Sequence, residues 1–139
     1  MQIFNAFETG KYSDENPSKN SSEIADDGYV RTKIINDESC SVSVASFRDG
    51  QVREKPHWHP NAAEIYYVLE GKGVATDSNG NKKNVEPGDV IYFSAGESHN
   101  MHAAPGYDCK YYRVQAGQDR HVEDWRLFYE LPNQWPKVK

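Results

Sequence analysis

The feature that most limits the fold of this chain is a succession of short β-like segments. From Tyr29 onward, runs rich in β-branched and aromatic residues alternate with turn residues, and helical periodicity is weak throughout. The segments expected to form strands are 29–35, 41–47, 64–70, 74–77, 82–85, 90–93 and 108–115. Many short strands with glycine and proline turns are typical of an antiparallel sandwich or barrel, so the sequence predicts an all-β fold.

Two of the connections carry specific turn signals. Asn79-Gly80 lies between the segments 74–77 and 82–85, and an Asn-Gly pair between two strands predicts a β-hairpin. Pro87-Gly88 occupies the two central positions of the next connection, which favours a type II turn. These turns fix the order of neighbouring strands in the middle of the chain.

The length of 139 residues fits one domain, 1–139. We expect a polar N-terminal arm over 1–28, a β-barrel core over 29–116 and a C-terminal extension over 117–139. The arm is predicted because Tyr12–Gly28 is rich in Ser, Asn, Asp and Glu and holds little to bury. Val122–Leu131 fits either a short helix or a final strand.

Composition excludes several classes of protein. The chain has 16 basic and 21 acidic residues, a net charge of −5 and no basic block, so no nucleic-acid partner is expected. The longest apolar or aromatic run, Ile65–Leu69, is too short to span a membrane. Residues 1–11 lack the features of a secretory signal, which favours a cytoplasmic location. Cys40 and Cys109 are then expected to be free thiols.

A spaced set of ligand-type side chains provides the functional signal. His57 and His59 flank one residue, and in a strand two such side chains point to one face about 6.6 Å apart, which suits two imidazoles on one ion. Glu64 follows a short turn, so its strand is expected to return antiparallel beside the first. With His99 from a later loop, the set predicts a site for one divalent ion. Because it contains no cysteine, Fe, Mn, Ni and Zn all stay open.

Four further residues could contribute to a site built around this set. Tyr66 shares the face of Glu64 by alternation, so it is either a general base or acid at the cavity wall or a packed core aromatic. His102 and His121 are expected at the surface. Arg113 is an anion clamp if it points inward, but it shares its strand face with both apolar and polar residues, so its direction is open.

Two stretches of the chain resemble the two motifs of the cupin superfamily. The first is Gly50-x6-His57-x-His59-x4-Glu64-x6-Gly71, where the family usually has five residues between the first Gly and the first His. The second is Gly88-x5-Ser94-x-Gly96-x2-His99-x3-Ala103, where the family usually has Pro at the Ser94 position and often Asn at the Ala103 position. These departures concern turn shape more than ligand atoms. The close resemblance spans Gly50 to Ala103.

The resemblance implies a small antiparallel jelly-roll β-barrel with one divalent metal ion per chain. Carried onto this sequence, the metal ligands are His57, His59, Glu64 and His99. Cupins are commonly dimers, so a homodimer is expected. In cupins that cleave dimethylsulfoniopropionate, a catalytic tyrosine lies two residues after the metal-binding Glu, and Tyr66 is similar at that one place.

Three classes of function follow from such a site. The leading one is an enzyme acting on a small polar molecule, either an Fe(II)-type dioxygenase or a metal-dependent lyase, isomerase or decarboxylase. The alternative is a non-catalytic module that binds a small molecule such as a sugar or an organic acid. The last is a metal barrel that only stabilises an oligomer.

Overall fold

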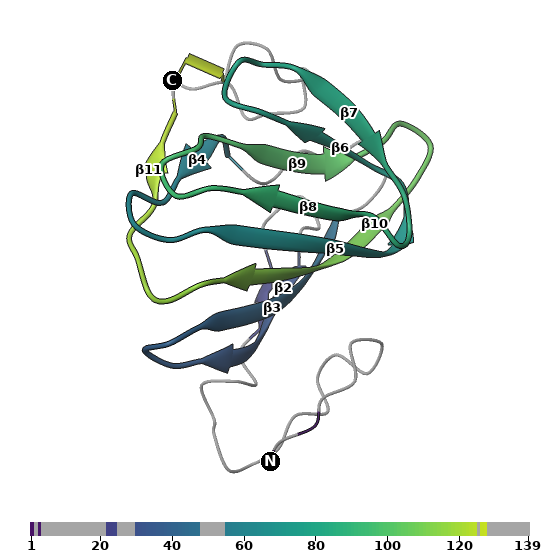
Figure 1. The fold of residues 1–139 in the computed structure, drawn as a ribbon. Helices are drawn as coiled ribbons and strands as arrows, with labels where there is room; N and C mark the ends of the chain where they lie inside the picture. The colour runs from purple at the N-terminus through teal and green to yellow at the C-terminus, as the bar shows by residue number, and fades with distance from the viewer. Residues whose placement is uncertain (2, 4–21, 25–29, 48–54, 125, 128–139) are drawn as a thin grey trace.

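The chain is described here from a computed structural model that covers residues 1, 3, 22–24, 30–47, 55–124 and 126–127. Within these residues the fold is all-β, and every strand pairing is antiparallel (Figure 1). The largest sheet has the order β1-β2-β3-β10-β5-β8, and the smaller sheets have the orders β7-β6-β9 and β11-β4. The strands are β1 Ser22–Ile24, β2 Val30–Asn36, β3 Ser41–Phe47, β4 His57–Trp58, β5 Glu64–Gly71, β6 Gly73–Thr76, β7 Lys82–Val85, β8 Val90–Phe93, β9 Asn100–Ala103, β10 Cys109–Gln115 and β11 Val122–Glu123.

The arrangement is the predicted jelly roll. Figure 1 shows β7, β6 and β9 continuing from the β8 side of the large sheet, with β4 and β11 at the end where β5 begins. The interior between the sheets is filled by one apolar cluster. Its buried members are Ala45, Phe47, Tyr66, Val68, Ala75, Val85, Phe93, Met101, Ala103, Cys109 and Tyr111.

Strand β5 shows how the sequence produces this interior. Glu64, Tyr66 and Val68 are buried, whereas Ile65 and Tyr67 are 39% and 42% exposed on the other face. This is the period-two alternation expected of a strand that covers a core on one side. Glu64 therefore points into the barrel from the same face as two core residues, as the alternation predicted.

Cross-strand pairing arranges the interior side chains of β3, β10 and β5 in rows. Neighbours in a row are direct pairing partners, and the rows change from polar to apolar along β10. Three successive rows are Ser41–Gln115–Glu64, Ser43–Arg113–Tyr66 and Ala45–Tyr111–Val68. The interior thus has a polar end, at the start of β5, and an apolar end.

A bulge in β2 extends the polar rows by one strand. Lys33 pairs with Ser43 and Asn36 pairs with Ser41, with a register irregularity between Lys33 and Ile35. Strict alternation would place residues 33 and 36 on opposite faces. The extra residue, Ile34, lets both pair with residues of the interior face, which is how a bulge redirects side chains.

The expected strands and turns are largely confirmed. The segments 41–47, 82–85 and 90–93 are strands with the predicted bounds, and the others differ by one or two residues at their ends. The turn at Pro87-Gly88 closes with a 3.0 Å hydrogen bond from Asp89 N to Glu86 O, and Gly88 has φ +95°. Gly71 has φ +76°, and a Cβ there would lie 1.7 Å from Asp108 O, so only glycine fits.

Three expectations need correction or extension. The strand β4 does not pair with β5 but with β11, because it is only two residues long and the chain then crosses to the large sheet. A strand, β1, lies within the segment expected to be an arm. Of Val122–Leu131, the start forms β11, and residues 125 and 128–131 lie outside the described part of the chain. The proposed boundaries at 28 and 116 stay predictions.

Both cysteines are free thiols, as expected. Burial raises the pKa of the Cys109 thiol to about 12, so this side chain behaves as a small apolar core residue. None of the residues that the structure describes belongs to a helix with the length and hydrophobicity needed to cross a membrane.

Candidate metal centre

Backbone pairing brings two distant segments together at the polar end. His57 and His99 form an isolated antiparallel bridge, with His57 N donating to His99 O at 3.0 Å and His99 N donating to His57 O at 2.9 Å. Their ring centroids lie 4.7 Å apart. The loop that precedes His99 is also fixed to the other segment, because Gly96 N donates to His59 O at 2.8 Å. The two motif segments therefore form one local unit.

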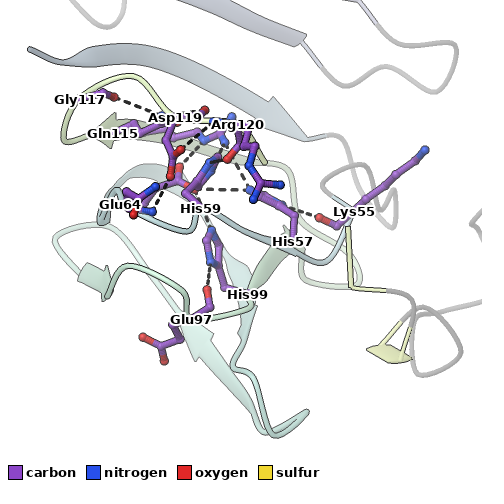
Figure 2. A network of polar contacts seen from close by, with 12 residues as sticks. Lys55, His57, His59, Glu64, Glu97, His99, Gln115, Gly117, Asp119 and Arg120 are labelled. Carbon is purple, nitrogen blue, oxygen red and sulfur yellow. Dashed lines mark hydrogen bonds and ion pairs between the residues drawn. The ribbon is translucent and has the colours of Figure 1, made fainter. Parts of the chain in front are cut away.

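Hydrogen bonds to backbone carbonyls fix how each imidazole presents its nitrogens. The Nδ1 atoms of His57, His59 and His99 lie 2.6, 3.1 and 2.9 Å from the carbonyl oxygens of Lys55, Arg120 and Glu97 (Figure 2). A carbonyl oxygen only accepts, so each Nδ1 carries the proton. In a neutral ring, Nε2 is then left as a lone-pair donor to a cation. Hydrogen bonds of this kind, from Nδ1 to a carbonyl oxygen, orient the rings of metal-binding histidines.

All three Nε2 atoms face one carboxylate oxygen. Glu64 Oε1 lies 2.5 Å from His59 Nε2, 3.0 Å from His99 Nε2 and 3.4 Å from His57 Nε2. Nitrogens that carry no proton and a carboxylate oxygen repel one another at these distances. A positive charge among them, either a metal ion or added protons, removes the repulsion. The donor set of nitrogens and one hard oxygen therefore fits a divalent cation.

The four predicted ligands do not contribute equally to this cluster. The ligand atoms of His57, Glu64 and His99 all lie within 4.8 Å of one another, and the three side chains are buried. His59 contacts Glu64 and its ring is 5.0 Å from that of His57, but it lies outside this group of three. The structure thus brings all four residues to one place, with three of them mutually close.

The sequence left the direction of the Arg113 side chain open, and in the structure this side chain points inward. Its Nε donates to Glu64 Oε2 at 2.6 Å, and its Nη2 lies 3.4 Å from Nε2 of both His57 and His59. Burial alone would raise the pKa of Glu64, but the Arg113 guanidinium beside it holds that pKa well below its usual range. Glu64 is therefore ionised, with Oε2 held by Arg113 and Oε1 turned to the histidines.

A cavity of about 160 Å³ opens beside these residues. Its floor comes from the polar rows of β2, β3 and β10, and its rim comes from the loop after β10. The lining includes Lys33, Ser43, His59, Arg113, Asp119 and His121. The cavity is thus polar, charged and continuous with two of the residues that face Glu64.

Tyr66 and His102, two further residues considered in the sequence analysis, are both buried. Tyr66 is fully buried, with its ring centroid 5.3 Å from Phe93, 4.8 Å from Tyr111 and 5.8 Å from His99. The surface expectation for His102 is wrong, because it is only 5% exposed within β9. Alternation alone missed this, since β9 is covered on both faces.

His121 is exposed, as expected, but it also contributes to the site. Its ring centroid lies 5.8 Å from that of His57, and the side chain lines the cavity. Neither contact had a signal in the sequence, because both depend on how the segment after β10 returns to pair with β4.

Comparison with known families decides the assignment. Residues 43–115, more than half of the chain, match the family described as a cupin domain. This chain is a cupin. The match includes the four motif residues His57, His59, Glu64 and His99.

Two curated relatives of this cupin have assigned roles. It is 38% identical over 58 residues to the oxalate-binding protein of Thermotoga maritima, covering 42% of this chain and 47% of that protein. It is 35% identical over 69 residues to the (R)-mandelonitrile lyase of Granulicella tundricola, covering 50% of this chain and 52% of that protein. The cupin thus spans about half the length of the curated relatives it matches.

Solved structures support the fold. A double-stranded β-helix protein from Klebsiella pneumoniae has a TM-score of 0.70 at 18% identity, with 88% of this chain and 96% of that chain covered. A DMSP lyase from Ruegeria pomeroyi has a TM-score of 0.63 at 18% identity, with 79% and 60% covered. At such identities the likeness concerns the fold and not the activity.

Proposed function

We propose that this cupin is a mononuclear metal-dependent enzyme that acts on a small polar molecule, as an Fe(II)-type dioxygenase or as a lyase, isomerase or decarboxylase. One observation carries the proposal. Three imidazole Nε2 atoms, from rings whose Nδ1 atoms donate to backbone carbonyls, converge on one oxygen of a buried carboxylate. His57, His59, Glu64 and His99 would hold the ion, which we expect to be Fe, Mn, Ni or Zn.

The chain's own residues would prepare the site for a substrate. When bound, a divalent ion supplies Lewis acidity that polarises a substrate oxygen or lowers the pKa of a bound water. Arg113 holds Glu64 Oε2 and so keeps the other oxygen turned toward the imidazoles. The cavity lined by His59 and Arg113 gives a small molecule access to that place. Four ligands on a six-coordinate ion would leave room for it.

Elemental analysis of the purified protein, followed by a substrate screen, tests the proposal. We expect about one divalent ion per chain, and at least about tenfold less metal in His99→Ala. His102→Ala is the matched control, because it removes another buried imidazole outside the group. Metal content equal in both variants would refute the centre. Turnover that depends on air identifies the dioxygenase class, and equal turnover without oxygen excludes it.

Non-catalytic binding of an organic acid is the second candidate. Its support is the similarity to the oxalate-binding protein of Thermotoga maritima. The two candidates separate when a ligand is found. An enzyme consumes it and loses turnover in Glu64→Gln, whereas a binding module returns it unchanged.

Tyr66 stays a candidate general base or acid. Its ring lies near His99, but its full burial among Phe93 and Tyr111 favours the packing role. Replacing Tyr66 by Phe keeps the ring and removes the hydroxyl. If the hydroxyl moves a proton, kcat falls about a hundredfold or more with metal content unchanged. A rate close to that of the unmodified protein discards the catalytic role.

The expected homodimer and cytoplasmic location also stay predictions. On the outer face of β5 and β8, four large side chains are between 39% and 63% exposed: Ile65, Tyr67, Val90 and Tyr92. This face is where we would expect a partner subunit, because such apolar surface is often an interface. Sedimentation equilibrium measures the oligomeric state of the unmodified protein and of Tyr92→Lys. We expect a dimer that is weakened in the variant, and a monomer in both proteins refutes the dimer.

A further inference from the structure

The cavity beside the candidate metal centre contains features that narrow its ligand. Resting on the proposed metal centre, we propose that this cavity takes a small dicarboxylate, which Lys33 and Arg113 select. Neither residue belongs to the two stretches that resemble the cupin motifs. It is carried by strand register, by charge and by size.

Strand register places both cations on the cavity floor. Lys33 pairs with Ser43, and Ser43 pairs with Arg113, so the three residues form one cross-strand row. Adjacent strands are about 4.8 Å apart, so the backbones of Lys33 and Arg113 are separated by roughly 10 Å. The residue between them is a small serine. Two long cationic side chains therefore stand on either side of a short one, as a two-point anion site requires.

The bulge at Ile34 extends this floor. It allows Lys33 and Asn36 to reach the interior face together, beside Ser43 and Ser41. All four line the cavity. The floor therefore offers one ammonium group, one amide and two hydroxyl groups next to the Arg113 guanidinium. This set binds carboxylate oxygens and offers little apolar surface to a hydrocarbon.

Charge favours a ligand with two negative charges. Lys33 and Arg113 are balanced by Glu64 and Asp119. Asp119 is held by the backbone, since Oδ2 accepts from Asn61 N at 2.6 Å and Oδ1 accepts from Arg120 N at 3.0 Å. With a divalent ion at the metal centre, the ion and the side chains of Lys33, Arg113, Glu64 and Asp119 together carry a net charge of +2. A dicarboxylate neutralises this charge, whereas a neutral sugar or amide does not.

The size of the cavity suits a ligand of a few carbon atoms. Its volume is about 160 Å³. Since a water molecule takes about 30 Å³ of the liquid, the space corresponds to roughly five waters. Dicarboxylates of two to four carbons fit within this volume.

The test is a calorimetric titration of the zinc-loaded full chain with malonate and with malonamide, its neutral analogue. We expect malonate to bind at least about tenfold more tightly. Lys33→Gln is expected to weaken malonate binding at least about fivefold and to leave malonamide binding and zinc content unchanged. Lys83→Gln is the matched control, because it removes the same charge from an exposed position on β7. It is expected to bind malonate like the unmodified protein.

Arg113 is tested in the same way with two variants. Arg113→Gln is expected to weaken malonate binding at least about tenfold, and Arg113→Lys to restore part of the loss because it returns the charge. Malonate binding in Arg113→Gln equal to that of the unmodified protein would overturn the role of Arg113.

The outcomes separate this inference from the proposed function. Zinc retained with equal affinity for malonate and malonamide overturns the dicarboxylate and leaves the metal centre standing. Equal loss in Lys33→Gln and Lys83→Gln overturns the selective role of Lys33. Failure to retain zinc is measured independently by elemental analysis and refutes the proposed function itself. Malonate itself chelates zinc, so the zinc content of every variant is measured again by elemental analysis after its titration, and affinities are compared for protein that has kept its zinc.

Discussion

The two ends of the barrel interior are built on the same strands and have opposite chemistry. At the apolar end, Phe47 pairs with Cys109 and Ala45 pairs with Tyr111, and all four are buried. At the polar end, only two residues further along β10, Arg113 contacts Glu64 and the imidazoles. Alternation along a strand determines that a side chain points inward. The position along the strand determines whether it meets a core or a site.

The ends also differ in what stabilises them. Removal of apolar surface from water stabilises the apolar end, and this depends little on what is bound. At the polar end, three imidazole nitrogens and a carboxylate oxygen repel one another without a cation. The polar end should therefore gain stability from a ligand, whereas the apolar end should already have its full stability.

The largest expected effect is a loss of stability at the apolar end that leaves the metal content of the polar end unchanged. Phe47→Ala removes a ring that stacks on Tyr111 with centroids 5.7 Å apart. We expect a loss of about 3–5 kcal/mol in the free energy of unfolding, with an unchanged metal content per folded chain. Urea unfolding and elemental analysis measure the two quantities. Lys83→Ala, at an exposed position of β7, is the control and should cost less than about 1 kcal/mol. Metal lost in step with stability would show that the two ends are not independent.

The second effect acts on the polar end alone. The reference is the protein in a solution whose free metal ion concentration is about a hundred times the dissociation constant of the ion. Removal of the metal with a chelator should then lower the free energy of unfolding by about 2.7 kcal/mol. The melting temperature of the unmodified protein should fall accordingly, and that of His57→Ala should not change. A chelator effect that persists in His57→Ala would place the ion elsewhere.

The smallest effect uses a histidine that belongs to neither end. His102 Nδ1 donates to Ala103 O at 2.9 Å, and its Nε2 has no hydrogen-bond partner within the described structure. Burial lowers the pKa of His102 below its ordinary value of 6.5. The unfolded chain then binds more protons than the folded chain below pH 6.5, so stability falls as the pH falls.

His102→Asn should reduce this acid sensitivity. The slope of unfolding free energy against pH, measured on metal-free protein between pH 7 and pH 5, should be shallower by at most about 1.4 kcal/mol per pH unit. The histidines of the polar end are present in both proteins and cancel in the comparison. An unchanged slope would mean that His102 is protonated in the folded state.

The sequence was sufficient for most of the strands and for the four motif residues that gather at the site. Alternation in β5 placed Glu64 inward, and turn chemistry located the bends at Asn79-Gly80 and Pro87-Gly88. These features are local, since each depends on residues within a few positions. The cupin motifs then connected segments that no local rule connects.

What the sequence could not supply was the pairing between distant strands. The inward direction of Arg113 depends on its register against Ser43 and Tyr66, and β10 alone presents a mixed face. The pairing of β4 with β11 places His121 near His57 and follows from the path of the whole chain. The burial of His102 likewise requires a second covered face of β9.

The extra residue at position 34 also affects how this pocket can change over time. If the codon for Ile34 were deleted, Lys33, Ile35 and Asn36 would oppose Ser43, Val42 and Ser41 one to one in a regular ladder. Lys33 and Asn36 would then still face the cavity, and the loss would be felt in the separate apolar cluster where Ile34 packs with Val44. This pocket could therefore keep its ligand through a change in length that costs the protein only stability.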